Sequence, residues 1–337
     1  MTKIPAISCK NVWKIFGPNP EKYLAGMPAT HSYDDIRSDG YIAGVKDVTL
    51  DVAPSEILVI MGLSGSGKST LVRCFSRLHT ITGGTIEIEG QDITRLAEKD
   101  LIALRREKMG MVFQSFGLLP HRTVLENVAF PLEMRGQDKH ERIARAMEVV
   151  KLVGLEGRED YFPRELSGGQ QQRVGIARSL AIEPDIWFLD EPFSALDPLI
   201  RREMQDEFLR LQEMLGKTIV FITHDFDEAI RLADRIAIMK DGAVEQCDAP
   251  DRIVLNPATD YVRKFTEDID KARVVKAAAL ARKTASGSGT PVDAKQTLRS
   301  LAPSLVKDTR DIIPVQEKGK VIGGMKRTDA LEILLSN

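Results

Sequence analysis

A glycine-rich stretch at residues 62–70 has the residue types and spacing of a loop that binds phosphate groups. It follows an apolar run at residues 56–60, which predicts a buried strand, and it precedes residues 71–75, which predict a helix. Glycine permits a close backbone approach that a Cβ atom would block, so successive N–H groups can surround a phosphate. The residues that we expect to contact it are Gly62, Ser64, Gly65, Ser66, Gly67, Lys68, Ser69 and Thr70.

Two side chains at the end of this loop suit a nucleoside triphosphate with its metal ion. Lys68 supplies a mobile positive charge for the β- and γ-phosphates, and Ser69 supplies a hydroxyl for Mg²⁺. The helix that begins near Lys68 adds unpaired N–H groups and the positive end of its dipole. The alternative is a loop that merely turns the chain, and the Lys-Ser pair directly after a strand argues against it.

A pair of acids, Asp190 and Glu191, follows the apolar run at residues 185–189. At the end of a strand, two neighbouring carboxylates can serve one metal site in different roles. Asp190 would hold Mg²⁺, directly or through water, and Glu191 would polarise the attacking water as a general base. An exposed acidic turn is the alternative interpretation.

A further candidate lies at the start of the predicted helix from residue 167 to about 181. Ser167 is a good N-cap, and its hydroxyl with the amides of Gly168 and Gly169 can hold a γ-phosphate against the helix start. By itself, a Ser-Gly-Gly helix start is more often only a cap.

Alternating strands and helices predict an α/β fold with a mostly parallel core sheet. Strands are expected at residues 6–16, 45–52, 85–90, 111–114, 185–191, 218–223 and 235–239, and helices at 139–152, 198–215 and 226–233. In the helix at 139–152, Ile143, Ala146, Met147 and Val150 are expected on one apolar face. The strands around the phosphate loop suggest a small antiparallel sheet, and residues 17–44 form an insertion with one short helix near 20–26. Ligands in such folds bind at the carboxyl ends of the strands.

The composition is that of an ordinary globular protein of 337 residues, with 43% hydrophobic and 28% charged residues. Its apolar runs are shorter than the ~20 residues of a membrane span, and no signal-peptide pattern opens the chain. The three cysteines lack the spacing of a metal site, which favours reduced cytosolic thiols. A net charge of −2 gives no sign of nucleic-acid binding.

The charge is unevenly distributed along the chain. Residues 271–337 carry 13 Lys and Arg against 6 Asp and Glu, a net charge of +7, whereas the remainder has a net charge of −9. Residues 272–283 predict a helical spacer and 284–291 a Gly/Ser linker. Helices at 294–301 and 328–335 and strands at 312–315 and 320–325 follow. A basic tail on an acidic body suggests a separate small module with its own partner.

The motifs occur together in one order that identifies a family. The phosphate loop, Gln114, residues 166–170, the Asp190-Glu191 pair, residues 194–197 and His224 follow one another as in the ATPases of ABC transporters. Over residues 6–267 the chain resembles that family. The resemblance implies that ATP and Mg²⁺ bind and that two copies enclose two ATP molecules head to tail.

The resemblance also implies roles for individual residues. Phe16 would stack on adenine, with Trp13 as the alternative. Gln114 would reach Mg²⁺ and the attacking water and link the site to the membrane subunits, while His224 would hold the γ-phosphate and position Glu191. The residues expected to act on the other copy's nucleotide are Ser167, Gly168, Gly169, Gln170 and Asp197.

Finer features are similar to the ATPases of glycine betaine, proline betaine and choline importers. These are the start at residues 14–17, the insertion before residues 44–47, the loop at 61–70, and residues 113–116 and 193–201. Residues 312–315 and 319–324 resemble a single CBS repeat. The expected domains are an ATPase at 1–270 with a helical subdomain at about 115–182, a spacer and linker at 271–291, and a CBS-like regulatory module at 292–337.

This resemblance implies an osmoprotective importer ATPase attached peripherally to the cytoplasmic face of the inner membrane. Its expected partners are integral membrane permease subunits, a second copy of itself, a solute-binding protein indirectly, and anionic lipid through the basic tail, with no nucleic acid. One alternative is a soluble ABC ATPase of DNA repair or translation, but the chain lacks the heptads, zinc motifs and second cassette usual there. Another is a regulatory protein without turnover, against which the intact Lys68, Asp190, Glu191 and His224 argue.

Overall fold

A computed structural model describes residues 4–112, 117–194, 196–285 and 287–335. The chain forms two compact units. One comprises Met1–Glu228 with Met239–Val244, and the other comprises Ala229–Ile238 with Glu245–Asn337. The domain boundaries expected from the sequence stay a prediction.

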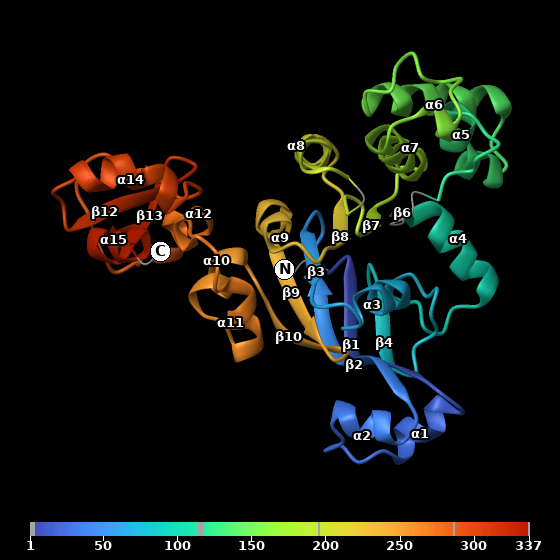
Figure 1. Cartoon of the computed structure of the whole chain (residues 1–337), viewed down its shortest axis with the longest axis horizontal. Coiled ribbons are helices and arrows are strands. Elements are labelled where there is room, and N and C mark those ends of the chain that lie inside the picture. The colour runs from blue at the N-terminus through green and yellow to red at the C-terminus, as the bar shows by residue number, and fades with distance from the viewer. Residues whose placement is uncertain (1–3, 113–116, 195, 286, 336–337) are drawn as a thin grey trace. The chain divides into compact units, whose positions relative to one another are not determined.

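The largest sheet has six strands in the order β10-β9-β3-β8-β7-β6 (Figure 1). Its strands are β3 (Ile57–Met61), β6 (Met109–Val112), β7 (Ile186–Asp190), β8 (Thr218–Ile222), β9 (Arg235–Lys240) and β10 (Ala243–Asp248). β3, β8, β7 and β6 pair in parallel. Every residue of β3, β7 and β8 is buried, as expected for strands of a parallel sheet that is covered on both faces. The mostly parallel core is therefore confirmed, while β10 had no sequence prediction.

A second sheet is antiparallel, as predicted, with strands in the order β2-β1-β4-β5. These strands are β1 (Ile7–Phe16), β2 (Ile42–Val52), β4 (Gly83–Ile88) and β5 (Gln91–Asp92). The last residue of β1, Phe16, pairs with the first residue of β2, Ile42. The insertion therefore leaves and rejoins this sheet at one residue pair.

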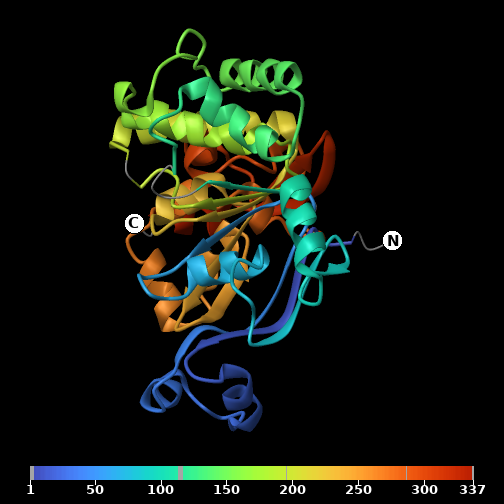
Figure 2. The same cartoon turned by 90° about the vertical axis from the view of Figure 1, so that its right-hand side faces the viewer.

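The insertion contains two helices, α1 (Pro20–Gly26) and α2 (Tyr33–Ser38), where the sequence predicted only the first. Ser32 caps α2 through a reciprocal pair of hydrogen bonds with Asp35, and the fully buried Ile36 anchors its inner face. Both views show α1 and α2 beyond the end of the long strands β1 and β2 (Figures 1 and 2). β2 begins at Ile42, three residues before the predicted strand.

The first unit contains seven further helices and one 3₁₀ turn within the described residues. They are α3 (Lys68–Phe75), α4 (Glu98–Lys108), α5 (Val124–Met134), α6 (Lys139–Leu152), α7 (Gly168–Leu180), α8 (Pro198–Leu215) and the start of α9 (Phe226–Leu232), with a 3₁₀ turn at Pro163–Glu165. α5, α6 and α7 pack together as the helical subdomain. The prediction that Met147 faces the core was wrong, because Met147 is 43% exposed and Val149 is buried instead.

Buried aromatic rings join β7, β8 and α8. The centroid of Phe208 lies 5.8 Å from those of Trp187 and Phe221, and Phe193 lies 5.6 Å from Phe221. The indole N–H of Trp187 donates to the Ser179 hydroxyl of α7 at 2.8 Å. This packing fixes the carboxyl end of β7, where Asp190 and Glu191 lie.

The C-terminal part holds a three-stranded sheet, β11-β12-β13, with helices beside it. Its elements are α10 (Pro250–Leu255), α11 (Asp260–Thr266), α12 (Lys271–Val274), α13 (Ala277–Leu280), β11 (Val292–Asp293), α14 (Leu298–Lys307), β12 (Ile312–Glu317), β13 (Lys320–Lys326) and α15 (Arg327–Leu335). The predicted helix at 294–301 starts instead at Leu298, where Thr297 caps it.

The continuous helix expected at residues 272–283 is absent from the described chain, which has the two short helices α12 and α13 there. Between α12 and α13 the backbone is extended, and Lys276 forms an isolated antiparallel β-bridge with Thr297. Ala272, Val275 and Ala277 are buried in the same apolar cluster as Leu298 and Val315. This segment is therefore packed into the module rather than exposed as a spacer.

No helix in the described ranges is both long and apolar enough to cross a membrane.

Candidate functional site

The phosphate loop joins β3 to α3, and its glycines occupy positions that a side chain would block. Gly67 has φ +101°, and a Cβ there would lie 2.2 Å from the carbonyl oxygen of Gly44. A Cβ at Gly62 would lie 2.3 Å from the carbonyl oxygen of Met239. Backbone atoms of other segments therefore pack closely against the loop at Gly62 and Gly67. This packing leaves room only for glycine and maintains the concave backbone that can bind an anion.

Lys68 begins α3 and is almost completely buried. Its ammonium donates to the carbonyl oxygens of Gly62 at 2.8 Å and Leu63 at 3.0 Å. Burial lowers the pKa of Lys68, while the carboxylates of Glu191 and Asp190 partly oppose that shift. The cation is held inside the loop, where phosphate oxygens would complete its coordination.

Ser69 and Asp190 come together from α3 and β7. The Ser69 hydroxyl donates to Oδ1 of Asp190 at 3.1 Å. Burial raises the pKa of Asp190, and the hydrogen bond from Ser69 opposes that rise. A hydroxyl and a carboxylate are hard oxygen ligands, and Mg²⁺ in proteins is commonly held by one or two such groups together with substrate phosphates. Within the described ranges, no cluster of three or more His, Cys, Asp or Glu forms a separate metal site.

Glu191 lies one residue further, in an unusual backbone conformation. Its φ of +46° is left-handed, which costs a residue with a side chain about 1 kcal/mol, and its N–H donates to the carbonyl of Ile222 at 3.1 Å. The conformation turns the side chain toward the loop after β8. There, Oε2 of Glu191 lies 3.2 Å from Nδ1 of His224. The two residues that the sequence predicted as base and positioning residue are thus neighbours.

Most of the predicted site residues line one cavity of about 510 Å³, although Gly62 and Asp190 are not among its lining residues. From the sequence-predicted set it is lined by Phe16, Ser64, Gly65, Gly67, Lys68, Ser69, Thr70, Glu191 and His224. Ser66 is buried and is not among the lining residues. Trp13, the alternative to Phe16, is not among the lining residues. Gln114 lies outside the described residues, and its assigned role stays a prediction.

Four further lining residues, Tyr33, Ile42, Ala43 and Gly44, were not predicted from the sequence. Gly44 packs against the Phe16 ring, because a Cβ there would lie 2.8 Å from Cε2 of Phe16. In the sequence, only the position of Gly44 directly before the predicted strand at residues 45–52 pointed to this contact. Tyr33 comes from the second insertion helix, and no motif pointed to it.

Phe16 itself is held by polar neighbours. The ammonium of Lys14 lies 4.9 Å from the centre of its ring, and His79 meets it edge-on at 5.7 Å. Phe16 is still 37% exposed, and it lines the cavity. An exposed aromatic face beside a phosphate loop can stack on a nucleotide base.

The start of α7 does not line this cavity. Ser167 caps α7, accepting from the N–H of Gln170 at 3.3 Å and donating its own N–H to Oε1 of Gln170 at 3.0 Å. Gly169 packs on the start of α8, since a Cβ there would lie 2.7 Å from Cγ2 of Ile200. Asp197 caps α8, so Asp197 and the start of α7 belong to neighbouring helix N-termini.

A buried hydrogen-bond network supports the loop that carries His224. Glu228 accepts from Nε2 of Gln205 at 2.9 Å and is itself buried. Nη1 of Arg201 lies 3.4 Å from Oδ2 of Asp225, and Nη2 of Arg201 donates to the carbonyl of Leu196 at 3.2 Å. The chain on either side of Asp197 is thereby tied to the residues around His224.

Known proteins match this chain along most of its length. A family model described as ABC transporter matches residues 45–194. TmoW of Ruegeria pomeroyi, the ATP-binding protein of a trimethylamine N-oxide transport system, is 76% identical over 98% of this chain and 97% of its own. ProV of Escherichia coli, from a glycine betaine/proline betaine transport system, is 46% identical over 98% of this chain and 82% of its own.

A solved structure also resembles the chain. The ATP-binding cassette MJ0796, as a dimer in a post-hydrolysis state bound to ADP and Pi, is 36% identical and superimposes with a TM-score of 0.61. The match covers 72% of this chain and 98% of that one. The phosphate loop, Glu191 and His224 lie around one cavity, and a relative is 76% identical over nearly its full length. This chain therefore belongs to the ATP-hydrolysing ATP-binding subunits of ABC transport systems.

Proposed function

We propose that this chain powers an ABC importer of trimethylamine N-oxide, with glycine betaine as the second candidate solute. The observation that carries the first assignment is the 76% identity to TmoW of a trimethylamine N-oxide transport system. The 46% identity to ProV supports the second. Trimethylamine N-oxide has the trimethylated nitrogen of glycine betaine and choline, so it extends the solute class expected from the sequence.

The cavity residues divide into two tasks in this proposal. Lys68 and the loop amides bind the ATP phosphates, and Ser69 with Asp190 holds Mg²⁺, which neutralises phosphate charge when it is bound. Glu191 takes the proton of the attacking water, and His224 orients Glu191 from a distance of 3.2 Å. Gln114 is proposed to contact the metal and water.

Two copies of the chain are proposed to close on two ATP molecules. Support comes from the start of α7, which is well formed and capped yet lies outside the cavity of its own chain. The dimeric MJ0796 cassette gives a solved example of such an assembly. Ser167, Gly168, Gly169, Gln170 and Asp197 would then meet the partner's nucleotide, and the dimer would act on permease subunits at the cytoplasmic face of the membrane.

The C-terminal module is proposed to be a single CBS-like regulatory unit. Its three-stranded sheet and two flanking helices enclose a continuous apolar cluster, which supports an independent function. The net charge of +7 over residues 271–337, which include this module, favours contact with anionic lipid or with an acidic protein surface. Such contacts weaken as salt rises, so the module is proposed to restrain the importer at low ionic strength.

The test of the solute assignment is solute-stimulated ATP hydrolysis by the complete transporter. The chain is co-purified with its permease and reconstituted into vesicles, and ATP hydrolysis is measured with the cognate receptor loaded with trimethylamine N-oxide or with glycine betaine. Stimulation by the first solute at lower concentration supports the first assignment, and stimulation by glycine betaine alone supports the second. Failure to co-purify with any permease would contradict the transport function.

A further inference from the structure

The insertion between β1 and β2 supplies the cavity with an aromatic side chain that the ABC motifs do not account for. We infer that Tyr33 is a second aromatic contact for the purine base of ATP, beside Phe16. This inference rests on the proposed ATP site. Tyr33 lines the same cavity of about 510 Å³ as Phe16, Lys68 and Glu191.

The strand pairing explains how the insertion reaches the cavity. Phe16 at the end of β1 pairs with Ile42 at the start of β2, and both line the cavity. The insertion thus begins and ends at the cavity rim, next to the residue expected to stack on adenine. Because both ends of the insertion lie at the cavity, a side chain from within the insertion can also reach the cavity.

Local structure holds Tyr33 at the first position of α2. The preceding residue, Ser32, accepts from the N–H of Asp35 at 3.1 Å, and its own N–H donates to that carboxylate at 2.9 Å. The fully buried Ile36 anchors the next turn. In addition, the ammonium of Lys46 on β2 donates to the carbonyl of His31 at 3.1 Å. The backbone is therefore fixed both before and after Tyr33.

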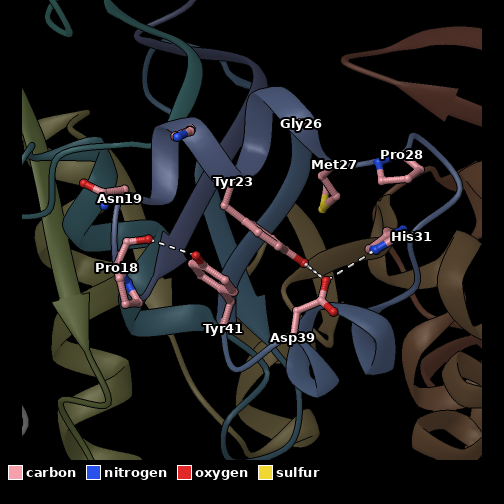
Figure 3. Close-up of a pocket in the computed structure, with 10 residues that line it drawn as sticks. Pro18, Asn19, Tyr23, Gly26, Met27, Pro28, His31, Asp39 and Tyr41 are labelled. Carbon is pink, nitrogen blue, oxygen red and sulfur yellow. Dashed lines mark hydrogen bonds and ion pairs between the residues drawn. The ribbon is translucent and has the colours of Figure 1, made fainter.

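A cluster of polar and aromatic groups braces the rest of the insertion (Figure 3). Tyr23 and Tyr41 stack with ring centres 3.8 Å apart, and the Tyr23 hydroxyl donates to Asp39 at 2.7 Å. His31 lies 3.5 Å from the same carboxylate oxygen. Burial, followed by the hydrogen bond to Asp39, raises the pKa of Tyr23 to about 12, so this donor is retained at physiological pH.

The brace connects both ends of the insertion. The Tyr41 hydroxyl donates to the carbonyl of Pro18 at 2.9 Å, and a Cβ at Gly17 would lie 2.3 Å from the Tyr41 ring. The chain directly after Phe16 is thus packed against the chain directly before Ile42. Because the ends are braced, the position of Tyr33 is set by the fold of the insertion rather than by contact with a nucleotide.

The chemistry of Tyr33 fits a base rather than the phosphates. The phosphates are already served by the backbone amides, Lys68 and Ser69, whereas a neutral aromatic ring offers a π-face and a large apolar area. Removing one stacking aromatic weakens the binding of a base by about tenfold. Tyr33 would therefore strengthen ATP binding without contributing to phosphate binding.

The experiment compares two ligands of the full-length chain, ATP and inorganic tripolyphosphate, by calorimetry with Mg²⁺. Tripolyphosphate has no base, so it reports the phosphate loop alone. We expect Tyr33→Ala to weaken ATP binding about tenfold and to leave tripolyphosphate binding within twofold of wild type. Tyr33→Phe should restore ATP binding, because it keeps the ring. Tyr161→Ala removes an exposed tyrosine outside the cavity and is the control.

Three other outcomes would contradict the inference or the proposed ATP site. If Tyr33→Ala binds ATP like wild type, Tyr33 does not contact the base. If both ligands lose affinity equally, Tyr33 acts on the phosphate loop or the fold, and the inference is wrong. If wild type binds neither ligand, the proposed ATP site itself fails. In the assembled transporter, Tyr33→Ala should raise the KM for ATP and leave kcat unchanged.

Discussion

The imidazole Nδ1 of His224 lies 3.2 Å from Oε2 of Glu191. The two residues follow neighbouring strands, β7 and β8, and the left-handed backbone at Glu191 turns its carboxylate toward the histidine. A carboxylate held in this way can accept a proton from water while the imidazole fixes its orientation.

Glu191→Gln should retain ATP binding and lose at least about 100-fold in hydrolysis, because an amide cannot accept the proton from the attacking water. Phosphate release by the assembled transporter measures the loss, and gel filtration with ATP should show an accumulated dimer. Glu203→Gln, at an exposed acid on α8, is the control. Hydrolysis near the wild-type rate would show that Glu191 is not the base.

Lys68→Ala should lose nucleotide affinity at least about tenfold, since the buried cation inside the loop is removed. Calorimetry with ATP measures this directly. Lys139→Ala removes an exposed lysine at the start of α6 and should bind ATP normally. Unchanged affinity in Lys68→Ala would count against its role in phosphate binding.

Ser167→Arg should block hydrolysis in the dimer and leave ATP binding to the isolated subunit within about twofold, because the start of α7 lies outside its own cavity. Ser167→Ala is the matched control, since it removes the same helix cap, a loss of about 1 kcal/mol, without adding bulk. The comparison of activity in the two variants isolates the steric block. A parallel loss of monomer binding and activity in Ser167→Arg would refute action on the partner's nucleotide.

Glu228→Gln should change how stability depends on pH. Burial raises the pKa of Glu228, opposed by hydrogen bonds from Thr223 and Gln205, while the charge of Asp225 adds to the rise and Arg201 opposes it. A raised carboxyl pKa means that the folded state holds the proton more tightly. Ionisation therefore costs stability as pH rises above the ordinary value of 4.5.

The variant lacks this ionisation and can still accept from Gln205. Its urea midpoint, relative to wild type, should therefore increase from pH 4 to pH 8. Glu203→Gln again serves as the exposed control. A constant difference between variant and wild type across this range would show that Glu228 does not titrate differently in the folded protein.

The basic module should confer a response to salt. A variant with four of its exposed lysines replaced by glutamine should hydrolyse ATP faster than wild type at low salt in vesicles with anionic lipid, because its electrostatic contact is weaker. The lysines are Lys295, Lys307, Lys318 and Lys320. Raising salt, which shortens the Debye length to about 3 Å at 1 M, should bring wild type to the same rate.

The control for this experiment replaces four exposed lysines outside the module. These are Lys99, Lys139, Lys151 and Lys264. Activity in vesicles with and without anionic lipid separates a lipid contact from a contact with protein. An identical salt response in the module variant and wild type would show that the module is not the sensor.

The chemistry of the site could be predicted from sequence because it depends on contiguous motifs. The loop from Gly62 to Lys68 needs glycines at fixed spacing, and β7 must end at Asp190 for its acid to face that loop. Parallel strands deliver their carboxyl ends to one edge, so the pairing of Ser69 with Asp190 follows from the order of elements. The helix at Pro198–Leu215 was likewise predicted at its observed bounds.

Features that depend on long-range packing were decided only by the tertiary structure. Tyr33 lies in an insertion without apolar periodicity, and it reaches the cavity because Phe16 pairs with Ile42 and the insertion folds back on its own brace. The alanine-rich stretch at 272–283 has the composition of a helix. Burial of Ala272, Val275 and Ala277 against Leu298 outweighs that propensity, which is a weak preference beside tertiary contacts, and divides the stretch into α12 and α13.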